Sequence, residues 1–161
     1  MATPAHRPPA CRLRPGGVDD LDDVMRVMMA AFQPCFGEAW TRSQCAGILP
    51  MAGVTLTLAE DDDESALGFA LARTIADEAE LLLIAVNPSS QRRGVGQALL
   101  MHFIEQARQA GAETLHLEVR DNNPAIALYS AAGFRPAGRR RNYYSGADGT
   151  KHDAVTLKLV N

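Results

Sequence analysis

The chain has 161 residues, of which 47% are hydrophobic and 22% charged, and its formal net charge is −3. This length predicts one domain with a substantial core, here residues 11–161 after a flexible N-terminal tail at residues 1–10. The slightly acidic balance argues against direct nucleic-acid binding, and no apolar run has the length that spans a membrane. Cys11, Cys35 and Cys45 follow neither a disulfide spacing nor a metal-site spacing, so we expect reduced thiols, no metal and a cytoplasmic location.

Hydrophobic periodicity along the chain predicts the element order βααβββαβαββ. The expected elements cover, in that order, residues 11–14, 21–32, 41–49, 54–60, 67–75, 79–86, 94–109, 114–119, 122–132, 134–137 and 154–160. Asp19 or Asp20 is suited to cap the first helix, and Thr41 the second. The order indicates an α/β fold, a single layered structure with a mixed sheet.

The segment from Gln91 to Leu100 joins a strongly apolar strand to the longest expected helix. It places two arginines and two glycines at the junction. N–H groups at a helix start lack intrahelical partners and carry partial positive charge, which suits them to phosphate. Glycines admit a phosphate close to the backbone, and arginines add full charges. The pattern predicts a phosphate-binding turn, and a plain turn with solvated arginines is the alternative.

Two kinds of nucleotide-binding loop do not fit this segment. A P-loop has Lys and then Ser or Thr after its last glycine, where this chain has Gln97 and Ala98. A dinucleotide-binding fingerprint has a third glycine where this chain has Leu99, and it follows an early strand. The phosphate would therefore belong to a different kind of ligand.

Three motifs at matching spacing resemble those of the GCN5-related N-acetyltransferases. Gln91-Arg92-Arg93-Gly94-Val95-Gly96 has the form of the family's acetyl-CoA signature, Gln/Arg-x-x-Gly-x-Gly/Ala. Asn122 to Tyr129 matches Asn-x-x-Ala-x-x-Leu-Tyr, and Gly133-Phe134 follows it. The element order is also the family's, so the resemblance covers about residues 11–160. It implies a mixed, largely antiparallel sheet with two splayed parallel central strands and helices on both faces.

The resemblance implies acetyl-CoA as the cosubstrate, without a metal. In this family the pyrophosphate lies on the amides at the helix start, and the pantetheine arm bonds the free edge of the preceding strand. The residues that the resemblance assigns to acetyl-CoA binding are Ile84, Ala85, Val86, Gln91, Arg92, Arg93, Gly94, Val95, Gly96, Gln97 and Asn122. Asn122 would hydrogen-bond the pantetheine arm.

The resemblance also assigns two catalytic residues, Glu118 and Tyr129. Tyr129 would protonate the leaving thiolate, as a phenol with a pKa of about 10 can do for a thiol of about 8.5. Glu118 would act as the base, and strand alternation weakly supports this because it places Glu118 and Leu117 on opposite faces. A packed aromatic and a surface or ion-paired glutamate are the structural alternatives. The segment between Glu118 and Asn122 is one residue shorter than in typical relatives.

Within the family, Leu117-Glu118-Val119-Arg120 and Arg141-Asn142-Tyr143-Tyr144 resemble the bacterial ribosomal-protein-alanine N-acetyltransferases, the RimI group. This implies a protein N-terminus as acceptor, such as that of a ribosomal protein, with Trp40, Tyr143 and Tyr144 lining the acceptor site. The Trp40 loop matches in part, because Ala39 stands where these relatives have proline. A protein α-amine, with a pKa of about 7.7–8.0, is partly neutral at pH 7, whereas a lysine amine at about 10.4 is almost wholly charged.

We therefore expect an acyltransferase that acetylates a protein N-terminal α-amine, of alanine, by direct attack on the thioester. One carboxylate acting through water would then suffice as the base. Two alternatives stay open. An acetyltransferase for a small-molecule amine would use the same acetyl-CoA residues. A module that binds acetyl-CoA without turnover is the other alternative, suggested by the shortened segment after Glu118.

Overall fold

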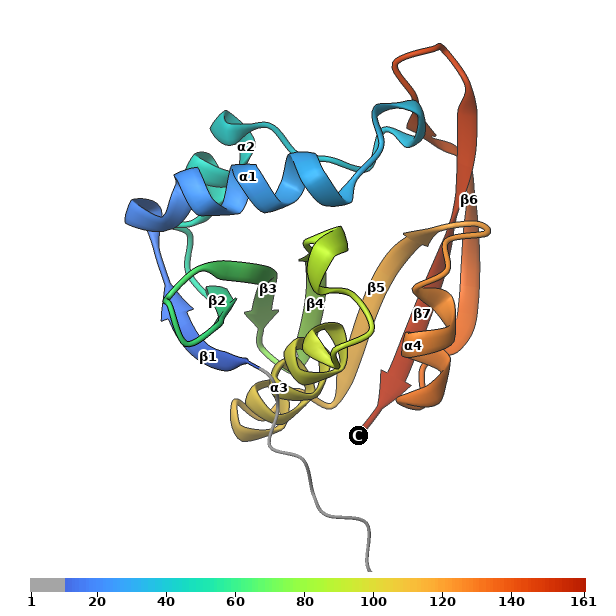
Figure 1. The fold of residues 1–161 in the computed structure, drawn as a ribbon. Helices are drawn as coiled ribbons and strands as arrows, with labels where there is room; N and C mark the ends of the chain where they lie inside the picture. The colour runs from blue at the N-terminus through green and yellow to red at the C-terminus, as the bar shows by residue number, and fades with distance from the viewer. Residues whose placement is uncertain (1–10) are drawn as a thin grey trace, which may run out of the picture.

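The structure, a computed structural model, describes residues 11–161, so the expected tail at residues 1–10 lies outside the described part. The helices and strands follow the predicted order (Figure 1). The strands are β1 (Arg12–Gly16), β2 (Val54–Glu60), β3 (Ala66–Ile75), β4 (Glu78–Val86), β5 (Thr114–Arg120), β6 (Arg135–Ser145) and β7 (Lys151–Val160). The α-helices are α1 (Leu21–Ala31), α2 (Arg42–Ile48), α3 (Val95–Gln109) and α4 (Ile126–Ala131).

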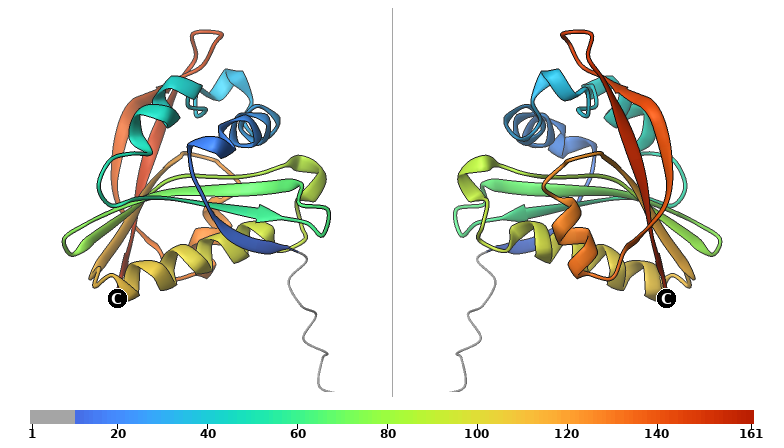
Figure 2. Two further views of the ribbon diagram at one scale, coloured as in Figure 1. Left: turned by 90° about the vertical axis from the view of Figure 1, so that its left-hand side faces the viewer. Right: turned by 90° about the vertical axis from the view of Figure 1, so that its right-hand side faces the viewer.

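The strands form one seven-stranded sheet in the order β1-β2-β3-β4-β5-β7-β6. All neighbouring strands are antiparallel except β4 and β5, which are parallel. These two pair only from Glu78 and Thr114 to Leu81 and Leu117, and then they part. Helices α1 and α2 cover one face of the sheet, and α3 and α4 the other (Figure 2). The expected sheet, with its splayed parallel pair, is therefore confirmed.

A β-bulge at Leu82 lies just where β4 and β5 part. Leu71 of β3 pairs with Leu83 and Ala72 pairs with Leu81, which leaves Leu82 as an extra residue. Leu81 packs in the core beneath α3, whereas Leu83 packs in the core beneath α1. An extra residue reverses which side chains face each side and bends the strand. The bulge therefore turns the end of β4 away from the line of β5.

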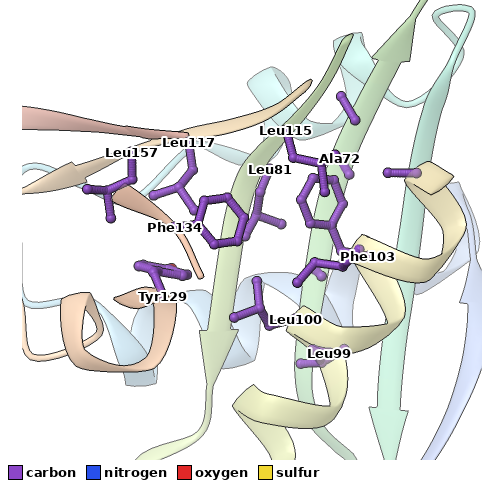
Figure 3. Packing of buried hydrophobic residues seen from close by; sticks show 14 of the residues in the cluster. Ala72, Leu81, Leu99, Leu100, Phe103, Leu115, Leu117, Tyr129, Phe134 and Leu157 are labelled. Carbon is purple, nitrogen blue, oxygen red and sulfur yellow. The ribbon is translucent and has the colours of Figure 1, made fainter. Parts of the chain in front are cut away.

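One part of the hydrophobic core lies between α3 and the sheet. Buried residues recur along α3 at the spacing of one helix face, namely Leu99, Leu100, Phe103, Ile104 and Ala107. They pack with Leu81, Leu115 and Leu117 of the two central strands (Figure 3). Phe134, which is fully buried, lies beside Tyr129 in the same cluster. Burying each large apolar side chain stabilises the fold by about 1.5–3 kcal/mol.

The segment before α4 differs from the prediction, because the helix begins at Ile126 and not at Asn122. Asn122 has a positive φ of 69°, outside the right-handed helical region. Pro124 also disfavours a helical conformation at Asn123. The Asn123 side chain instead accepts a hydrogen bond from the Ala125 N–H at 2.9 Å. The residues from Asn122 to Ala125 are thus a shaped connection between β5 and the helix.

Strand β6 and the start of β7 are longer than the prediction. β6 continues to Ser145, and β7 begins at Lys151 and not at Ala154. Asp20 does stand at the N-cap of α1, but its carboxylate accepts hydrogen bonds from Arg14 and from the Gly17 N–H. Within residues 11–161, no helix is long and apolar enough to cross a membrane.

Candidate active site

The parting of β4 and β5 opens a cleft of about 1030 Å³. Its walls come from β4, β5, the start of α3, the segment from Asn122 to Tyr129, the α1–α2 connection, and Tyr143 and Tyr144 of β6. All of the predicted site residues line this cleft except Arg93. One cavity therefore brings together side chains that are spread over most of the described chain.

One end of the cleft is the start of α3. Gly94 occupies the N-cap with φ +79°, and no side chain of residues 11–161 caps the helix. Within this part of the chain, the first N–H groups of α3 therefore have no intrahelical or side-chain acceptor. Arg92, which lines the cleft, also has a positive φ of 65°. A Cβ placed on Gly96 would meet Val86 and Leu128, two other residues of the cleft wall, at 3.6 and 3.5 Å. A side chain at this position would thus take up space between these two residues of the wall.

The middle of the cleft is the free edge of β4. Ile84, Ala85 and Val86 pair with β3 on one side, and on the other side pairing with β5 has already ended at Leu81. The backbone groups of residues 82–86 that face β5 therefore have no strand partner among the described strands. An extended ligand can hydrogen-bond such an edge in the way that a strand would.

Tyr129 is buried, with 5% of its surface exposed, and it lines the cleft. Its ring packs edge-on against Phe134, with ring centroids 6.1 Å apart. Burial raises the pKa of the Tyr129 phenol well above its usual value, and the charge of Glu38 and the neighbouring Tyr144 raise it further. The phenol is therefore protonated across the physiological range, which is the form that can donate a proton.

The two carboxylate oxygens of Glu118 have different surroundings. Oε1 forms an ion pair with Arg140, whose Nε lies 2.9 Å away, and the Glu118 side chain is 15% exposed. Oε2 is buried and has no hydrogen-bond partner among residues 11–161. The expected parity of β5 is confirmed, because Leu115, Leu117 and Val119 are buried in the core beneath α3, whereas His116 and Glu118 between them are only half-buried. A buried carboxylate oxygen without a partner is suited to accept a proton from a group that enters the cleft.

Trp40, Tyr143 and Tyr144, which the sequence predicts to line the acceptor site, all line the cleft, and we call the part that they line its acceptor end. Tyr143 and Tyr144 meet edge to face, with centroids 5.0 Å apart. The Tyr144 hydroxyl donates to the Glu118 backbone carbonyl at 3.4 Å, and burial raises the pKa of this phenol. The β6–β7 hairpin contacts the α1–α2 connection, where the Ala147 N–H donates to the Pro34 carbonyl at 3.0 Å. This contact joins two walls of the acceptor end.

Among the polar residues of the cleft that carried no functional assignment in the sequence, three form a connected group. They are Glu38, Arg120 and Asn123. Arg120 and Glu38 lie inside segments whose motifs were recognised, but their contact joins positions 82 residues apart. No local spacing could have signalled it.

The comparisons with known proteins agree with this geometry. Residues 21–134 match the sequence model of the acetyltransferase (GNAT) family. The chain belongs to this family. The structure is similar to the crystal structure of the ribosomal-protein-S18-alanine N-acetyltransferase from Escherichia coli, with a TM-score of 0.83 and 33% identity over 93% of each chain.

Two proteins that are similar to this chain in sequence have nearly the same name as that enzyme. The ribosomal protein bS18-alanine N-acetyltransferase of Escherichia coli K12 is 49% identical over 92 residues, which are 56% of this chain and 62% of that protein. The protein of the same name from Salmonella typhimurium LT2 is 41% identical over 131 residues, 75% of this chain and 88% of that protein. The resemblance to the bacterial ribosomal-protein-alanine N-acetyltransferases is thereby confirmed.

Proposed function

We propose that residues 11–161 form one GNAT domain that transfers the acetyl group of acetyl-CoA to the α-amine of a protein N-terminus. The observation that carries this is a single cleft joining the uncapped start of α3, with Arg92, to Glu118 and Tyr129. The names of the relatives support alanine as the acceptor residue and a ribosomal protein as the acceptor chain. Free thiols at all three cysteines support a cytoplasmic location.

The chain's own groups fit each part of acetyl-CoA. The free N–H groups of α3 and the Arg92 guanidinium suit a pyrophosphate. The open edge of β4 at Ile84–Val86 suits the amides of the pantetheine arm, and Asn122 lines the same cleft. When bound, acetyl-CoA supplies an acetyl thioester as the electrophile. A backbone N–H of the β4 edge would polarise the thioester carbonyl.

Glu118 and Tyr129 divide the proton transfers. Glu118 Oε2 takes a proton from the acceptor amine, directly or through water, as the amine forms its bond to the acetyl carbon. Tyr129 gives its proton to the departing thiolate, so that the products are an amide and a free thiol. The raised pKa of Tyr129 keeps the phenol protonated at neutral pH, so that its proton is available when the thiolate departs. The Arg140 contact orients the Glu118 carboxylate through its other oxygen.

A panel of acceptors tests the proposal. Release of free CoA is measured with a peptide that begins with alanine, with the same peptide blocked at its α-amine, and with free amino acids and polyamines. We expect turnover with the unblocked peptide only. Turnover with the small amines alone would identify an acetyltransferase for small molecules. Tight acetyl-CoA binding with no turnover on any amine would identify a binding module.

A further inference from the structure

Glu38 is held from both sides by residues far along the chain. It lies in the connection between α1 and α2, and its side chain is 11% exposed. Oε1 accepts from Arg120 Nε at 3.0 Å, and Oε2 accepts from Asn123 Nδ2 at 2.9 Å. Both oxygens of a nearly buried carboxylate are therefore satisfied by two partners on other elements.

Arg120 ties this carboxylate to the end of β5. Its side chain is 10% exposed, and its guanidinium lies over the ring of Phe36 with Cζ 3.6 Å from the ring centroid. Phe36, like Glu38, belongs to the α1–α2 connection. A second nitrogen of Arg120 donates to the Asp121 carbonyl at 3.3 Å. The α1–α2 connection, which is one wall of the acceptor end, is thus held to β5 by an ion pair and by a stacked ring. The same strand carries Glu118, two residues before Arg120.

Asn123 ties the same carboxylate to the helix that carries Tyr129. Its amide nitrogen donates to Glu38, while its carbonyl oxygen accepts from the Ala125 N–H at 2.9 Å. The Ala125 carbonyl in turn accepts from the Tyr129 N–H at 3.1 Å. A short hydrogen-bonded path therefore runs from Glu38 through Asn123 to the backbone of Tyr129.

We infer that Glu38 is a positioning residue: it locks the α1–α2 wall of the acceptor site to the strand of Glu118 and to the helix of Tyr129. The inference rests on the proposed function for the roles of those two residues. Glu38 itself exchanges no proton with the amine or the thiolate. Its part is to set the distance between the α1–α2 wall and the acid–base pair.

A reciprocal pair of substitutions separates positioning from general stability. Glu38→Gln puts an amide donor against a donor whichever way it turns, because Arg120 and Asn123 both donate. Asn123→Asp keeps the acceptor for Ala125 but brings two carboxylates together. In the double variant, the introduced amide can donate to the introduced carboxylate and accept from Arg120, and the net charge of the group is that of the wild type. Contact pairs of this kind give non-additive effects.

We expect each single variant to raise the KM for an alanine-starting peptide and lower kcat, together by about tenfold in kcat/KM for one broken buried hydrogen bond. The affinity for acetyl-CoA should change less than about twofold, because Glu38 and Asn123 are not among the residues proposed to bind it. The double variant should recover most of the loss. Glu105→Gln, at an exposed position on α3, is the matched control.

Additive losses in the double variant, or wild-type kinetics in both single variants, would overturn the inference. Should one single variant fail to fold, the other single variant and the double variant still decide. Amide hydrogen exchange over residues 121–129 gives a second reading that needs no turnover. Faster exchange is expected in both single variants and not in the control, and unchanged exchange would contradict the inference. A wild-type protein that acetylates no peptide would instead count against the proposed function.

Discussion

Leu81 of β4 and Leu117 of β5 are the last residues through which these two parallel strands pair. The extra residue Leu82 follows immediately and bends β4 away. Both leucines lie in the core beneath α3, so apolar contacts hold the point at which the two strands part. Every proposed step of the reaction depends on this parting of β4 and β5, because it frees the edge of β4 and exposes Glu118 to the same cleft.

Replacing Tyr129 with phenylalanine should lower kcat by about a hundredfold or more, the usual contribution of a general acid. The phenylalanine ring keeps the edge-on contact with Phe134, so the fold should stay intact. Steady-state kinetics and a thermal unfolding curve check this. Acetyl-CoA affinity should hardly change, and a kcat equal to that of the wild type would exclude Tyr129 as the acid.

Replacing Glu118 with glutamine should lower kcat/KM for the peptide by about a hundredfold at neutral pH. The amide has nearly the shape of the carboxylate but cannot take the proton of the amine. Raising the assay pH through the pKa of the α-amine, about 7.7–8.0, should recover part of the loss because more acceptor is already neutral. A variant whose loss is the same at every pH between about 7 and 9 would show that Glu118 has only a structural part.

Local signals in the sequence were enough for most of the fold. The capping box of α2 is one example: Thr41 Oγ1 accepts from the Gln44 N–H at 3.1 Å, and the Gln44 side chain accepts from the Thr41 N–H at 2.7 Å. The extent of β6 could not be predicted in this way. It is an edge strand whose residues are almost all exposed, so it lacks the alternation of apolar and polar residues that reveals a strand.

Some residues of the site could likewise be predicted from local motifs, whereas others depend on contacts between distant parts of the chain. The α3 start and Tyr129 belong to continuous motifs, and the structure brings both to one cleft as expected. The contacts of Glu38 join segments that are distant in the sequence, and no local sequence pattern predicts contacts of this kind. Arg93 shows the reverse case: it belongs to the motif, but its side chain does not line the cleft.

Arg92 and Arg93 therefore form a natural pair for testing the phosphate site. Arg92→Gln should weaken acetyl-CoA binding by about tenfold, the worth of one charge-assisted hydrogen bond near solvent. Arg93→Gln should have a smaller effect, since a role for this residue would come through its backbone. Calorimetric titration with acetyl-CoA compares the two, and the difference should shrink at high salt. An equal loss in both variants would mean that Arg93 turns toward the ligand.

The ion pair between Asp20 and Arg14 should make stability depend on acid pH. Arg14 holds the pKa of Asp20 below its ordinary value of 3.8, helped by the Gly17 N–H. The stabilisation is therefore present above that value and is lost as the pH falls through the lower folded-state pKa. Asp20→Asn should reduce the free energy of unfolding by about 1 kcal/mol at pH 7, and by less as the pH falls below about 3.8.

Urea unfolding of this variant at several pH values measures the effect. Asp22→Asn is the matched control, because Asp22 pairs with Arg42 at a side chain that is 89% exposed. That substitution should change stability by less than about 0.5 kcal/mol at any pH. A loss in the Asp20 variant that does not depend on pH would show that the loss does not come from the charge of Asp20.

The central claim is that the α-amine of a protein N-terminus attacks in this cleft. The direct measurement uses a peptide that begins with alanine and contains one internal lysine, incubated with the protein and acetyl-CoA. Tandem mass spectrometry then locates the added acetyl group. We predict that the acetyl group is found on the alanine α-amine, while the lysine stays unmodified. Acetyl on the lysine side chain, or none at all with acetyl-CoA bound, would contradict the proposed function.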